Sequence, residues 1–135
     1  MTEQEARDRI VAQQMLLARE CLDDAAAAAS RGSSRLAWNR AYYAGFHAAT
    51  AVFVARGRRF KKHRGIIKAV HEELVPQGFV GPEQAVAFEG LYAQRLDADD
   101  GDFLDIPREQ VANTLATARR FVAAMQAAID SSGGG

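Results

Sequence analysis

Residues 38–50, WNRAYYAGFHAAT, place two different stripes of side chains on one alanine-rich helix. An α-helix turns by about 100° per residue, which gathers a mostly aromatic set into one sector: Trp38, Tyr42, Phe46, Ala49 and Phe53. A mixed polar and apolar set falls roughly opposite: Arg40, Tyr43, His47 and Val54. We expect the first stripe to face the core of the bundle and the second to face away from it. The second stripe either carries out chemistry or fills a seam between helices, for instance against a second protomer.

Further segments on both sides of this stretch have the three- and four-residue apolar spacing of amphipathic helices. The first segment begins with a capping box at Thr2 and continues to Gly32. The helix that contains residues 38–50 then starts after a cap at Ser33 or Ser34 and stops at Gly57. Both boundaries are therefore predicted from ordinary helix-end residues.

Three more helices are predicted downstream. One covers about residues 62–75 and is stopped by Pro76, since proline cannot continue a helix. Another has Pro82 in its first turn, where proline is favoured, and the last starts near Pro107. No segment has a convincing strand pattern. The sequence therefore predicts an all-α fold, an antiparallel helical bundle of about five helices.

The composition is that of an ordinary globular protein, with 48% hydrophobic and 25% charged residues. We expect a single domain at residues 1–130 and a flexible tail at 131–135. The 17 basic and 17 acidic side chains cancel, so any role in binding polyanions has to be local. Cys21 is the single cysteine, which excludes an internal disulfide and fits a reducing compartment. Without a membrane-spanning run or a signal peptide, we expect a cytoplasmic protein that does not contact membranes.

Residues 56–68, RGRRFKKHRGIIK, contain seven lysines or arginines and form the basic segment of an otherwise neutral chain. Such a local concentration is typical of a surface that binds a phosphate backbone. We predict contacts of this kind from six residues: Arg58, Arg59, Lys61, Lys62, His63 and Arg64. The alternative is a solvated turn that keeps the protein soluble. For His63, a structural role at the start of the next helix or across the bundle competes with a role as second catalytic histidine.

Two charged features lie near the end of the fourth predicted helix. Arg95 falls on the apolar edge of this helix, and Asp99 follows at i+4. A half-buried arginine needs a carboxylate, so a structural ion pair is the first interpretation and support of an active site the second. The acidic run DADDGDFLD, residues 97–105, lacks the spacing of a calcium-binding loop and is predicted to be an acidic surface loop. We find no metal or cofactor motif and expect neither.

Three motifs, in this order, resemble the HEPN family of small helical proteins, specifically its short single-domain branch in bacteria and archaea. They are RAYYAGFH at residues 40–47, KKHRG at 61–65 and RLDAD at 95–99. The resemblance covers roughly Ala18 to Phe121 and implies a HEPN-like bundle. The sequence departs from the branch at Ala41, where active members often have a polar residue, and at Asp100, where a tyrosine is usual.

The resemblance implies a metal-independent endoribonuclease of the toxin type, whose motif is an arginine, four to six residues and a histidine. Arg40 and His47 occupy this motif as the catalytic pair, and we place four residues in support: Asn39, Tyr43, Arg95 and Asp99. Histidine can act as base or acid near neutrality, and arginine grips phosphate. One histidine cannot easily perform both proton transfers, so we expect a homodimer that shares the site. RNA is then the ligand of the basic segment.

Many members of the family pair with a nucleotidyltransferase-type antitoxin. The alternative function is therefore a non-catalytic HEPN interaction module that binds such a partner or a nucleotide.

Overall fold

The computed structural model describes residues 1–99 and 106–133, with the backbone alone at 94–99 and 132–133. Its elements are five α-helices and one short π-helix: α1 (Glu3–Ser30), α2 (Ser34–Ala55), α3 (His63–Ala69), η1 (Val70–Leu74), α4 (Pro82–Asp99) and α5 (Arg108–Gly133). The described part of the chain contains no β-strand, and the all-α prediction is confirmed. Helix α5 includes residues 131–133, which were expected in the flexible tail; residues 134–135 lie outside the described residues.

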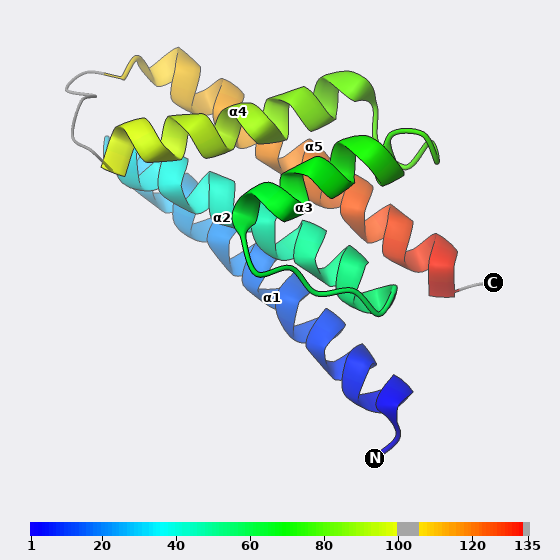
Figure 1. Cartoon of the computed structure of the whole chain (residues 1–135). Helices are drawn as coiled ribbons and strands as arrows, with labels where there is room; N and C mark the ends of the chain where they lie inside the picture. The colour runs from blue at the N-terminus through cyan, green and yellow to red at the C-terminus, as the bar shows by residue number, and fades with distance from the viewer. Residues whose placement is uncertain (100–105, 134–135) are drawn as a thin grey trace.

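Helix α2 lies at the centre of the bundle (Figure 1). It packs antiparallel against α1 over most of its length and also contacts α3, α4 and α5. A helix that is apolar on nearly every side is a buried helix, and the many alanines of α2 let its neighbours approach closely. At Gly45 the neighbours leave little room, because an added Cβ would lie 3.0 Å from the Phe88 ring and 3.4 Å from the Phe121 ring.

The ends of the first two helices follow the sequence signals. The backbone N–H of Glu5 donates to the Thr2 hydroxyl at 3.1 Å, and this hydroxyl lies 3.2 Å from the Glu5 carboxylate. Ser33 is the N-cap of α2, but its side chain makes no capping hydrogen bond. At the other end Gly57 takes a φ of 78°, the left-handed conformation that commonly terminates helices.

The third predicted helix is not regular throughout. It starts as α3 at His63, but its second half is the π-helix η1, and a turn at residues 75–78 follows. Pro82 begins α4 as predicted, and α5 begins one residue after Pro107. No helix in the described ranges is both long and apolar enough to cross a bilayer.

Candidate functional site

Three side chains of the second stripe of α2 are half-buried and follow one another along one face: Arg40, Tyr43 and His47. Tyr43 lies between the two others: the Arg40 guanidinium carbon is 5.2 Å from the centroid of its ring, and the His47 ring centroid is 6.3 Å away. The structure therefore places Arg40 and His47 on one face with Tyr43 bridging them, as their spacing predicts.

The expectation that this stripe faces away from the core of its own bundle is wrong in part, because α1 covers one edge of it. Val54, at the end of the stripe, is 6% exposed. The Nδ1 atom of His47 lies 2.7 Å from the side-chain oxygen of Gln14, and Arg40 Nη1 lies 4.0 Å from the sulfur of Cys21. The stripe therefore lies at the boundary between α1 and α2: α1 covers one edge of it, and the other edge stays accessible.

The Arg40 guanidinium is oriented by its neighbour in the sequence. Its Nε and Nη2 atoms donate to the side-chain oxygen of Asn39 at 3.0 and 2.7 Å. Arginine presents five N–H donors, so these two bonds leave donors for a phosphate. On the other side, burial is the largest influence on the Cys21 thiol and raises its pKa, which makes it a poor nucleophile.

The environment of His47 favours its neutral form. Burial lowers the pKa of this imidazole from its usual 6.5, and the positive charge of Arg40 lowers it further. The side chain is therefore mainly uncharged at neutral pH. A neutral imidazole in this position can accept a proton.

His47 opens into a pocket of about 240 Å³ that it shares with part of the basic segment. The polar lining comes from Gln14 and Thr50 and from two arginines, Arg58 and Arg59. The walls are otherwise apolar: Ile10, Phe46, Phe53, Val54, Phe60 and Ile66. The link between α2 and α3 thus brings positive charge to the predicted catalytic histidine.

The members of the basic segment differ in what they contact. Arg58 pairs with Glu73 of η1 and lies over the rings of Phe53 and Phe60, at 5.6 and 5.0 Å from their centroids. It therefore anchors the link to the bundle. By contrast, four other cations are exposed on the same link and the start of α3: Arg59, Lys61, Lys62 and Arg64. Of these, Arg64 lies 5.7 Å from the ring of Tyr92.

His63 packs against aromatic residues of α2. It begins α3, and its Nδ1 atom lies 2.6 Å from the hydroxyl of the fully buried Tyr42. Its ring stacks on Phe46 with centroids 4.2 Å apart. It does not line the pocket beside His47. These contacts favour the structural interpretation of His63, and its predicted phosphate contact stays a prediction.

Arg95 and Asp99 both belong to α4, which continues to Asp99, so the prediction of a loop is wrong for residues 97–99. The side chains of Arg95 and Asp99 lie outside the described residues, as do residues 100–105, which include Asp100 and the rest of the predicted acidic loop. Their predicted ion pair and active-site support therefore stay predictions. Among the residues whose side chains are described, no three His, Cys, Asp or Glu side chains lie close enough together to hold a metal ion.

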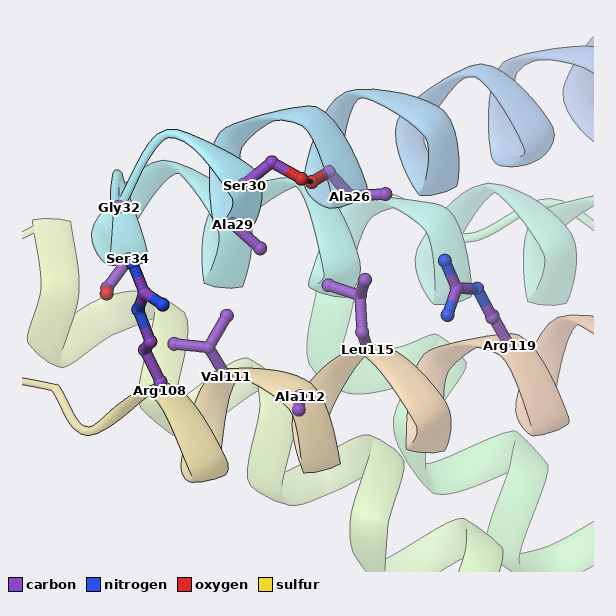
Figure 2. A pocket seen from close by; sticks show the side chains of 10 residues that line it. All are labelled: Ala26, Ala29, Ser30, Gly32, Ser34, Arg108, Val111, Ala112, Leu115 and Arg119. Carbon is purple, nitrogen blue, oxygen red and sulfur yellow. Dashed lines mark hydrogen bonds between the residues drawn. The ribbon is translucent and has the colours of Figure 1, made fainter.

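A separate groove of about 490 Å³ lies at the far end of the α1–α2 pair, against the beginning of α5. Figure 2 shows its small apolar floor and the side chains of Arg108 and Arg119, one on each side of Val111 and Leu115. None of the predicted site residues lines this groove. It is a second cationic surface, and it supplies a control for experiments on the basic segment.

Gln14 was not predicted as part of the site. The sequence does carry a weak signal, because Gln14 follows Val11 by three residues and precedes Ala18 by four. A glutamine at this position interrupts the apolar stripe of α1, and a polar side chain on such a stripe usually has a hydrogen-bond partner. Only the packing of α1 on α2 reveals that the partner is His47.

Two comparisons with known proteins agree with this architecture. The profile of the HEPN domain matches residues 14–128. A protein of Thermotoga maritima named UPF0332 protein is 31% identical over 124 residues, which cover 92% of this chain and 94% of the relative. The domain match includes the whole of α2 and the residues that line the His47 pocket, apart from Ile10. The chain is a member of the HEPN-domain family.

Proposed function

We propose that this protein is a metal-independent endoribonuclease of the HEPN toxin type, with Arg40 and His47 as its catalytic pair in a site shared by two protomers. The observation that carries the proposal is a histidine kept neutral by burial in a pocket that it shares with Arg58 and Arg59. A proton acceptor next to fixed positive charge is what cleavage of RNA by its own 2′-hydroxyl requires.

In the proposed reaction His47 takes the proton of the ribose 2′-hydroxyl. The 2′-oxygen then attacks the adjacent phosphorus, and the bond from phosphorus to the 5′-oxygen breaks. An acid returns a proton to this oxygen, so the products carry a 2′,3′-cyclic phosphate and a 5′-hydroxyl. Arg40 and Arg59 stabilise the negative charge of the phosphorane, because guanidinium groups stay charged and bind phosphate oxygens in pairs.

Among the described residues of a single protomer, no acid lines the pocket. Apart from His47, the ionisable residues that line it are Arg58 and Arg59, which do not release protons near neutrality. A second protomer related by a two-fold axis would add its own His47 and Arg40. We therefore place the dimer seam along the accessible edge of the Arg40–Tyr43–His47 stripe, with Tyr43 in the contact.

A second candidate function is favoured by the bonds of Arg40. Two of its nitrogens already bind Asn39, and its guanidinium covers Tyr43, an arrangement that suits a structural arginine. On this basis the protein would be a non-catalytic module that binds a nucleotidyltransferase-type antitoxin or a nucleotide. Such a module would retain full partner binding after Arg40→Ala or His47→Ala.

The test is cleavage of single-stranded RNA with EDTA present. The proposal expects cleavage by the wild type, 2′,3′-cyclic phosphate ends, and loss of activity in His47→Ala and Arg40→Ala. His71→Ala is the matched control, because His71 is a histidine on η1 that pairs with Glu89, away from the pocket. Equal activity in all variants would point to a contaminating nuclease, and activity that needs added magnesium would contradict the mechanism.

A further inference from the structure

The contact between Gln14 and His47 joins two helices at the proposed site. Gln14 comes from α1 and His47 from α2, and their side-chain oxygen and Nδ1 atoms are 2.7 Å apart. This is a short, well-formed distance for a hydrogen bond. Both residues line the same pocket. The position of the imidazole in this pocket therefore depends on how α1 packs against α2.

The chemistry of the two groups decides where the imidazole carries its proton. A glutamine side-chain oxygen can only accept, so Nδ1 of His47 has to be the donor. A neutral imidazole has a single N–H, which leaves the lone pair on Nε2. The nitrogen that can act as a base is therefore the one that Gln14 does not bind.

We propose that Gln14 is the positioning residue that holds His47 in the Nδ1–H form, so that Nε2 is the proton acceptor of the reaction. The role rests on the proposed ribonuclease function, but the hydrogen bond and the position of the proton can be measured without RNA. The choice of an amide has a consequence of its own. A carboxylate in this place would stabilise the imidazolium, whereas an amide fixes the ring without adding negative charge.

Arg40 lowers the pKa of the imidazole, and two further cations line its pocket. Arg40 lies on the same helix and, from the link, Arg58 and Arg59 line the pocket. All three are positive, and α1 contributes the neutral Gln14 on this side. None of the described residues that line the pocket is acidic. Replacement of Gln14 by glutamate would thus place a negative charge directly against His47.

The experiment combines nitrogen NMR of the His47 ring with RNA cleavage. The wild type should show protonated Nδ1 at neutral pH. In Gln14→Met the proton should move largely to Nε2, while Gln14→Glu should keep it on Nδ1 and raise the pKa of His47. Gln13→Met, which changes the exposed neighbour on α1, should leave the spectrum as in the wild type.

Cleavage should follow the NMR result. With Gln14→Met we expect kcat to fall about fivefold, the factor that corresponds to about one lost neutral hydrogen bond, with little change in KM. Gln14→Glu should retain activity but move the acid limb of its pH profile upward. A merely structural glutamine would change stability without moving this limb.

Two results would overturn the inference in different ways. If the wild type carries its proton on Nε2 at neutral pH, or if Gln14→Met leaves the proton on Nδ1, the positioning role is refuted whatever the protein does to RNA. If the spectra behave as expected but the wild type does not cleave RNA, the hydrogen bond is confirmed and the ribonuclease function fails, and the catalytic role of Gln14 fails with it.

Discussion

The exposed part of the basic segment offers the sharpest test of RNA binding. The perturbation is the triple replacement of Arg59, Lys61 and Lys62 by glutamine, which removes three exposed charges beside the His47 pocket. Arg58 is left in place because its pair with Glu73 anchors the link between α2 and α3. The proposal expects weaker RNA binding without loss of the fold, since exposed charges contribute little to stability.

The size of the effect follows from counterion release. On a single strand each phosphate contact contributes about 0.7 to the slope of log K against log salt concentration, so three lost contacts flatten the slope by about 2. At 0.1 M salt the same loss weakens binding by about 100-fold. Fluorescence anisotropy with a labelled single-stranded RNA measures both quantities, and a His47→Ala background keeps the RNA intact.

The matched control removes three other exposed charges, through Arg108→Gln and Arg119→Gln in the groove of Figure 2 and Arg31→Gln, which is next to the groove residue Gly32 in the sequence. This variant has the same net charge as the test variant, so a difference between them reports position and not total charge. Equal weakening by both triple variants would refute a localised phosphate path. Weakening by the control alone would place RNA on the other groove.

Three further predictions concern stability, assembly and pH. Gly45→Ala should be less stable than Gly90→Ala by about 1–3 kcal/mol, because an added Cβ meets the Phe88 ring at position 45 and open space at position 90. Both variants gain the same helix propensity. Thermal unfolding of the two variants therefore measures the cost of the contact with Phe88. Tyr43→Asp should convert the proposed dimer to a monomer in light scattering and abolish cleavage, and a fully active monomer would refute the shared site. Burial lowers the pKa of His47 in the folded state, so protons bind the unfolded chain more readily as pH falls below 6.5 and stability drops there. Chemical unfolding above and below this pH should show a smaller drop for His47→Gln than for the wild type.

Local signals in the sequence were enough to predict most helix ends. Thr2, Gly57 and Pro82 each act through backbone geometry or hydrogen bonds within a few residues, and each lies where the chain was expected to start or stop a helix. The π-helix η1 was not predicted. Its apolar residues have the spacing of an ordinary helix, and a single widened turn leaves no clear mark on such a pattern.

Contacts between distant segments explain what the sequence did not reveal about the site. The spacing of Arg40 and His47 predicts that they share a face, but it does not say that Gln14 of α1 lies against this face. The charge of Arg58 looks the same in the sequence as that of Arg59, yet Arg58 is paired with Glu73 fifteen residues away. Periodicity describes one helix at a time, whereas partners across the bundle depend on how the helices pack.

The electrostatics of the pocket also suggest why RNA itself would complete the proposed site. Burial and Arg40 keep His47 neutral in the protein alone, which suits a base but leaves a symmetric dimer without an acid. A phosphate bound between two protomers adds negative charge close to both imidazoles and favours protonation of one of them. The two histidines would then titrate as a coupled pair, one neutral and one charged. In this scheme the identical residues of two protomers become base and acid only when the phosphate is between them, and a protomer alone binds RNA without cutting it.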